Sequence, residues 1–163
     1  MLMTDDVADF EAWYRQAHPR LGTSLALVLG DVGLAQESAD EAFARALERW
    51  DRVATMESPT GWVYRVAFNE ARRRLRRAGL ERRLLRKHRW SSVDPPAGEM
   101  WEIVAGLPTR QRQAVVLRHV GQLREAEIGA AMGISRGAVS SSLHTAYKSL
   151  KSALDDPTVT SEA

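Results

Sequence analysis

The sequence predicts an all-α protein made of two small helical domains joined by a flexible linker. Helix-forming Ala, Leu, Arg and Glu dominate the chain, and apolar residues recur at the three- and four-residue spacing of amphipathic helices. Residues 91–98, SSVDPPAG, contain a Pro-Pro pair and lack this periodicity, which indicates a linker. We therefore expect a first domain at 1–78, a basic segment and linker at 79–99, a second domain at 100–154 and a flexible tail at 155–163.

Three helices are expected in the first domain. The first spans about 6–29 with a kink at Pro19, and the turn GDVG at 30–33 ends it. The third begins near Thr60, after a polar loop, and runs into a series of arginines. The second helix has a mainly acidic exposed face. Its inward residues are Ala39, Ala42, Phe43, Ala46, Leu47 and Trp50.

Charge is distributed unevenly along the chain. Residues 1–57 hold eleven acidic residues against five arginines, whereas residues 72–89 hold ten basic residues against one glutamate. A block this basic repels itself unless solvent or a polyanion neutralises it, and nucleic-acid phosphate is the usual polyanion in a cytoplasmic protein. A solvated charged helix is the alternative.

The second domain ends in a pattern typical of a helix-turn-helix. Gly133 can end one short helix in the left-handed conformation, and Ser135 stands where the N-cap of the next helix belongs. Beyond it, one stripe is apolar (Val139, Leu143, Ala146, Leu150, Leu154) and the opposite face is polar (Arg136, Gly137, Ser140, Ser141, His144, Lys148). Such a helix can lie in the major groove of DNA. The alternative is a solvated helix in an ordinary bundle.

Several classes of protein are disfavoured. The chain has no cysteine, which excludes disulfides and thiolate chemistry. The four histidines at 18, 88, 119 and 144 are scattered, and no motif for a cofactor, metal or nucleophile appears, so an enzyme is the least favoured interpretation. The acidic N-terminus does not resemble a signal peptide, and no segment has the length of a membrane span. We expect a cytoplasmic protein without cofactors or membrane insertion.

Two stretches together resemble the extracytoplasmic-function (ECF) sigma factors of the sigma-70 class. FEAWYRQAHPRL, GDVGLAQESADEAFARALERW and SPTGWVYRVAFNEARRRLRR look like region 2 of that family. LPTRQRQAVVLRHVGQLREAEIGAAMGISRGAVSSSLHTAYKSL resembles region 4, including its Leu-Pro start and the Gly-Ile-Ser before the reading helix. Their order and the short linker between them match the family, and the match covers most of the chain.

The resemblance implies a non-catalytic role with core RNA polymerase (beta-prime clamp and beta flap) and promoter DNA as partners. By position, polymerase would contact Glu37, Asp40, Glu41 and Arg45, with Phe43 and Trp50 holding that helix in place. A solvated acidic face is the alternative. Members of the group are often held by anti-sigma factors, although no residue of this chain identifies such a partner.

The resemblance also assigns the DNA contacts. The loop at 55–61 and the third helix would bind the minus-ten element, with candidates Trp62, Arg65, Asn69, Arg72 and Arg73. Unpaired bases need an aromatic platform or pocket and their backbone needs cations, although a Trp beside Val63 and Val66 also suits a core. The minus-thirty-five element would meet Arg136, Ser140, Ser141, His144 and Lys148.

The chain departs from the family at three places. Asp40 and Glu41 replace the usual Gln-Glu, and an arginine near Arg73 replaces an acidic residue. The reading helix has serines at 140–142 where the family has cations, which predicts weak intrinsic affinity for DNA, because arginine and lysine make the commonest specific contacts. Two alternatives therefore remain: a degenerate sigma-like protein that binds a partner without reading a promoter, and a stand-alone helix-turn-helix regulator, usually a symmetric dimer.

Overall fold

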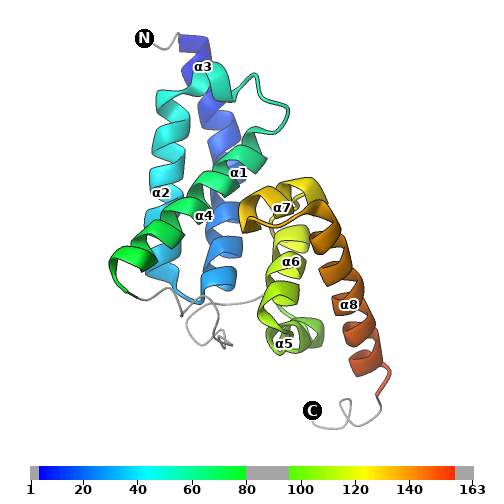
Figure 1. The fold of residues 1–163 in the computed structure, drawn as a ribbon. Coiled ribbons are helices and arrows are strands. Elements are labelled where there is room, and N and C mark those ends of the chain that lie inside the picture. Colours follow the sequence, from blue (N-terminus) through cyan, green and yellow to red (C-terminus); the bar gives the residue numbers. More distant parts are fainter. Residues whose placement is uncertain (1–3, 80–95, 157–163) are drawn as a thin grey trace.

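The computed structural model describes residues 4–79 and 96–156, which form eight helices and no strand within those two ranges (Figure 1). The rest of the basic block after Gly79, most of the Pro-Pro linker and the end of the tail lie outside the described residues. The all-α prediction is confirmed. Helices α1 to α4 form one bundle, α5 to α8 form a second, and the two bundles lie against each other (Figure 1).

The first bundle contains the three long helices that the sequence predicts. They are α1 (Thr4–Leu29), α2 (Val32–Glu48) and α4 (Pro59–Arg77), and α1 runs on through Pro19. Ser58 is the N-cap of α4: its hydroxyl accepts a hydrogen bond from the Gly61 amide at 2.9 Å. Pro59 follows at the first helical position, where its missing N–H costs nothing.

Three details of the first domain differ from the prediction. The turn after α1 is shorter than GDVG, because Asp31 already caps α2 by accepting the Leu34 amide at 2.9 Å. Trp50 begins a short helix of its own, α3 (Trp50–Val53), inside the expected loop. It is buried against Phe10 and Trp13, which explains why the chain coils there. Leu47 is 38% exposed and therefore does not belong to the inward face of α2.

The second bundle confirms the helix-turn-helix. Helices α5 (Glu99–Ala105) and α6 (Thr109–His119) lead into α7 (Glu125–Met132) and α8 (Arg136–Leu154). Gly133 ends α7 in the left-handed conformation with φ 70°. Ser135 caps α8 by accepting the Ala138 amide at 3.1 Å. The turn between the two helices is therefore fixed by the two residues that the sequence indicates.

The buried stripe of α8 is also confirmed, with one exception. Val139, Leu143, Ala146 and Leu150 are buried, whereas Leu154, the last residue of the helix, is 48% exposed because it lies at the helix end. The opposite face, from Arg136 to Lys148, is exposed as predicted. Helix α8 thus presents a polar surface to solvent.

Buried apolar side chains continue from one bundle into the other. Helix α7 packs across α4, and α6 approaches α1 (Figure 1). Tyr64 of α4 is completely buried at this junction, with its hydroxyl 2.9 Å from Ser24 Oγ of α1. Burial raises the pKa of Tyr64 to about 12, so its hydroxyl stays protonated at neutral pH. The two domains share one hydrophobic core in this conformation.

The left-handed residue that ends α7 yields a test of stability. Gly133→Ala places a Cβ in a conformation that costs L-residues about 1–2 kcal/mol, and we expect the free energy of unfolding in urea to fall by about that amount. The matched control is Gly137→Ala in the first turn of α8, where φ is ordinary and a Cβ meets no close neighbour. Stability there should be unchanged or higher by up to about 1 kcal/mol. Equal losses in both variants would contradict the assigned turn.

Candidate nucleic-acid and polymerase interface

The predicted minus-ten residues all lie on α4 and share one side of it. Trp62, Arg65, Asn69, Arg72 and Arg73 follow a spacing of three, four, three and one residues, which places them along a helical face. Arg65, Asn69 and Arg73 are exposed, and Trp62 is half-buried rather than part of the core. The structure thus brings these residues together on a surface that a ligand could reach, except at Arg72.

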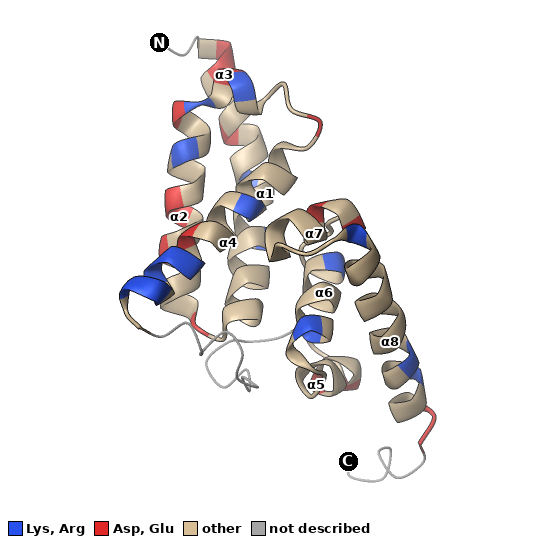
Figure 2. Cartoon of the chain, in the orientation of Figure 1, with Lys and Arg blue, Asp and Glu red and all other residues tan. Residues whose placement is uncertain are grey.

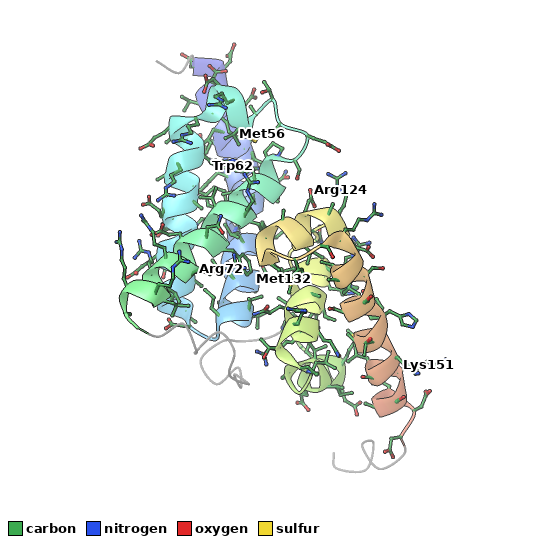
Figure 3. The ribbon with its side chains drawn as sticks, viewed as in Figure 1. Met56, Trp62, Arg72, Arg124, Met132 and Lys151 are labelled. Carbon is green, nitrogen blue, oxygen red and sulfur yellow. The ribbon has the colours of Figure 1, made fainter. Side chains whose placement is uncertain are left out.

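Arg72 is engaged by the second domain. Its guanidinium donates to the carbonyl of Ala131 at the end of α7 at 3.0 Å, and to Asn69 Oδ1 at 3.3 Å. It also lies over the Phe68 ring, 5.7 Å from the centroid. Burial, together with the nearby Arg76, lowers the pKa of the Arg72 guanidinium. Figure 3 shows Arg72 and Met132 where α4 meets α7. In this conformation Arg72 lies at the domain junction.

A single hydrogen bond joins the caps of two helices from different domains. Ser58, the N-cap of α4, donates its hydroxyl to the Glu127 carboxylate on α7. Glu127 also accepts the backbone N–H of Arg124 at 2.8 Å, which completes the capping box of α7. Glu57 adds an exposed ion pair to Arg124 at 3.7 Å. The loop at 55–61 is thereby attached to the helix-turn-helix.

Two glycines allow this close approach. A Cβ on Gly61 would come within 3.0 Å of Glu127 Cγ, and a Cβ on Gly121 would come within 3.1 Å of the Tyr64 hydroxyl. A side chain at Gly61 would have to displace the Ser58 hydroxyl and the Glu127 side chain, and one at Gly121 would also meet the Leu117 carbonyl at 2.7 Å. The sequence does not reveal this role, because nothing in it pairs these glycines with residues about sixty positions away.

An open cleft of about 970 Å³ lies beside the junction. The loop at 55–61 and the start of α4 form one wall of the cleft, and α7 with the first turn of α8 forms the other. Figure 3 labels Met56, Trp62 and Arg124 around it. Its charged lining comprises Arg52, Arg65, Arg118, Arg124, Arg136, Glu57, Glu125 and Glu127. Three of the predicted DNA contacts, Trp62, Arg65 and Arg136, therefore line a common, mainly cationic space.

The predicted polymerase residues lie on α2, but they carry intramolecular partners. Asp40 is 3.2 Å from His18 of α1. Glu41 accepts Arg45 Nε at 2.9 Å. Glu37 accepts Arg74 of α4 at 2.7 Å, although its side chain remains 65% exposed. Phe43 is buried on α2, and Trp50 is buried on α3, where it packs against Phe10 and Trp13 of α1.

Glu70 connects these surfaces, although no pattern in the sequence predicts this role. Its carboxylate is 3% exposed and contacts Arg73 at 2.7 Å, Arg74 at 3.0 Å and Arg45 at 3.3 Å. Burial alone would raise the pKa of Glu70, but the hydrogen bonds from Arg73 and Arg74 hold it below its usual range. Figure 2 shows the basic end of α4 beside acidic stretches of α2. In the sequence, only the position of this single acidic residue beside a run of arginines could have indicated its role.

The predicted minus-thirty-five residues all lie on α8 and all are exposed. They are Arg136, Ser140, Ser141, His144 and Lys148. Arg136 is 3.8 Å from Glu125 of α7, and its side chain is 77% exposed. The face offers two permanent cations and several hydroxyls, which suits contact with a DNA groove but provides few of the strong base contacts.

An exposed helix-turn-helix, a second basic helix and a shared cationic cleft define a two-domain DNA-binding protein. Residues 10–81 match the family described as Sigma-70 region 2, and residues 97–150 match Sigma-70, region 4. The RNA polymerase sigma-E factor of Streptomyces avermitilis is 30% identical over 156 residues, covering 92% of this chain and 87% of that protein. The sigma-E factor of Streptomyces coelicolor is 28% identical over 155 residues, covering 91% and 88%.

A solved structure has the same fold. It is the sigma factor RpoE in complex with the anti-sigma factor NepR from Bartonella quintana, with a TM-score of 0.66, 16% identity and coverage of 91% of this chain and 98% of that one. The chain belongs to the sigma-70 family of RNA polymerase sigma factors, in its ECF group. It is a sigma factor of the kind that directs transcription initiation. Among the described helices, none is long and apolar enough to cross a membrane.

The Glu127 contact predicts a dependence of stability on pH. Burial alone would raise the pKa of Glu127, but hydrogen bonds from Ser58 and Arg124 hold it below the ordinary value of 4.5. A lowered folded-state pKa means that the stabilisation is complete above about pH 4.5 and is lost as pH falls through the folded value. We expect Glu127→Gln to lose stability at pH 7 and to show a smaller further loss on acidification.

Thermal unfolding between pH 7 and pH 3 measures this effect. The matched control is Glu102→Gln in the same domain, an exposed glutamate, which should keep the acid sensitivity of the parent chain. An identical pH profile for Glu127→Gln and the parent would contradict the role of this carboxylate.

Proposed function

We propose that this ECF sigma factor docks α2 on the beta-prime clamp of core RNA polymerase, contacts the minus-ten element with α4 and meets the minus-thirty-five element with α8. The observation that carries the proposal is the pairing of region 2 and region 4 in one chain whose relatives align with it over nearly its whole length. The role is one of binding and DNA opening, without catalysis by the chain itself.

The surface of the first domain supports the assignment of its two partners. Glu37 and Asp40 are exposed on α2, and an acidic surface of this kind can pair with cationic side chains of a protein partner. Arg65 and Arg73 are exposed on α4, where guanidinium groups suit DNA phosphate. The half-buried Trp62 beside the cleft offers an aromatic face for an unpaired base.

Weak intrinsic reading by α8 is part of the proposal. Its exposed face carries serines where strong readers carry arginine or lysine, so polymerase must hold it at the promoter, with the beta flap as the expected attachment site of this domain. The same feature motivates the second candidate, a sigma-like protein that binds a partner without reading DNA. A stand-alone helix-turn-helix regulator is not favoured, because it leaves the region 2 domain unexplained.

An anti-sigma partner is also proposed. The solved structure of similar fold is described as a complex with an anti-sigma factor, and this chain has the same two-domain architecture. A protein that covers the acidic surface of α2 or keeps the domains in their present arrangement would prevent the proposed contacts with polymerase and promoter.

Promoter binding requires the two domains to separate. Ser58, the N-cap of α4, and Arg72, in its C-terminal half, are both in contact with α7. DNA and α7 would occupy the same side of α4, so the minus-ten element can reach the whole helix only after α7 has moved away. The closed arrangement described here is therefore the form of the free chain before promoter binding.

Co-purification with core RNA polymerase, followed by run-off transcription, tests the function. We expect the chain to bind core and to support transcription from its own promoters. Failure to bind core RNA polymerase under conditions in which an established sigma factor binds would contradict the proposal. Binding to core without any transcript would favour the partner-binding alternative.

Footprinting of the assembled holoenzyme tests the contacts of α8. Arg136→Ala with Lys148→Ala should abolish protection of the minus-thirty-five DNA, because these are the two permanent cations of the predicted reading face. The matched control, Arg15→Ala with Arg110→Ala, removes the same charge from exposed positions outside α8 and should retain protection. Equal protection in both double variants would contradict the assignment.

A reversible crosslink tests domain separation. Because the chain has no cysteine, Ser58→Cys with Glu127→Cys introduces the only two thiols, and a cleavable bismaleimide can join them. We expect the crosslinked protein to lose promoter opening and to recover it after the linker is cleaved. Each single-cysteine variant treated with the same reagent is the control. Full promoter opening by the crosslinked protein would show that α7 need not leave α4.

A further inference from the structure

Glu70 occupies an unusual position in the basic helix α4. Its neighbours Arg72, Arg73, Arg74, Arg76 and Arg77 make the end of this helix strongly cationic, yet the Glu70 carboxylate is 3% exposed. A buried carboxylate is stable only when charged partners replace the lost water. Here three guanidinium groups do so, at 2.7 Å, 3.0 Å and 3.3 Å.

These three arginines belong to two different surfaces. Arg73 and Arg74 come from α4, the proposed DNA helix, and Arg45 comes from α2, the proposed polymerase helix. The contacts continue outward on α2, where Arg74 also pairs with Glu37 and Arg45 with Glu41. Glu70 is the only buried member of this six-residue ionic network, so it is the one that solvent and salt screen least.

The outer carboxylates, Glu37 and Glu41, are the ones that a cationic surface of polymerase can bind. Glu37 is 65% exposed, and a cationic partner bound to it would compete with Arg74. Glu70 cannot be reached in this way because it is buried. Arg73 and Arg74 therefore keep a fixed partner on α4 itself, three and four residues away, whether or not α2 is docked.

We propose that Glu70 is a positioning residue for promoter binding: it fixes the Arg73 and Arg74 guanidinium groups in one array toward DNA phosphate while polymerase occupies α2. The inference rests on the proposed function. A positioning role and simple electrostatics predict opposite changes in DNA affinity when the charge of Glu70 is removed. Removing a negative charge from a DNA-binding face should by itself strengthen binding to a polyanion. If Glu70 positions the arginines, removing its charge weakens binding, because three guanidinium groups left together repel one another.

The test uses holoenzyme assembled with Glu70→Gln, which keeps the size of the side chain and removes its charge. Promoter affinity is measured at several salt concentrations, because each phosphate contact contributes roughly 0.9 to the slope of log affinity against log salt. Loss of two contacts should reduce the slope by about two, so the affinity lost between 50 mM and 200 mM salt shrinks by about tenfold. A purely structural loss of stability would not move this slope.

Three further variants make the test decisive. Arg73→Ala with Arg74→Ala should lower the slope by the same amount, and adding Glu70→Gln to it should produce no further drop. This double variant tests the proposal even if Glu70→Gln fails to fold. Glu48→Gln removes the same charge from an exposed position on α2 and is the matched control, with an unchanged slope.

Higher promoter affinity with Glu70→Gln, or an unchanged slope in the folded variant or in Arg73→Ala with Arg74→Ala, would overturn the inference. Its failure is distinguishable from failure of the proposed function. If no holoenzyme assembles with the parent chain, the function is wrong; if the parent holoenzyme opens promoters and the slopes do not change, only the role of Glu70 is wrong.

Discussion

The Glu127 carboxylate serves the N-termini of two helices that belong to different domains. It completes the cap of α7 through the Arg124 amide and accepts the hydroxyl of Ser58, which itself caps α4. Gly61 leaves room for this contact, which helps to set the direction in which α7 crosses α4. Helix α8 is joined to α7 by a turn of fixed geometry, so the orientation of its exposed face relative to the first domain depends on the same carboxylate.

The first domain separates its charges by helix, and the boundary between them is ionic. Acidic residues lie mainly on α2 and arginines mainly on α4, so the two faces attract each other within the chain (Figure 2). Surface pairs of this kind contribute little to stability because water screens them. Their value in the proposed role is that exposed pairs such as Glu37–Arg74 can be exchanged for contacts with polymerase, while the buried Glu70 keeps the helices in register.

The sequence predicted the parts of the fold that depend on local rules. The left-handed Gly133, the Ser135 cap and the buried stripe of α8 depend on residues within one or two turns, and they were found as expected except at Leu154. Trp50 was misplaced because its helix forms around aromatic contacts with α1, which periodicity along the chain does not encode. Ser58 with Glu127, and Glu70 with Arg45, depend on pairs 69 and 25 residues apart. The candidate contact residues of α2, α4 and α8 remain predictions.

The serine-rich face of α8 has a consequence for how promoters are distinguished. A weak binding element tethered to a second one acts at a high effective local concentration, and its occupancy depends on whether both sites can be reached at once. In the proposed role, α8 therefore contributes to promoter selectivity less through base-specific contacts than by requiring a defined separation between the two promoter elements. Promoter selectivity then depends on the length of the spacer between the two elements rather than on the sequence of either element alone.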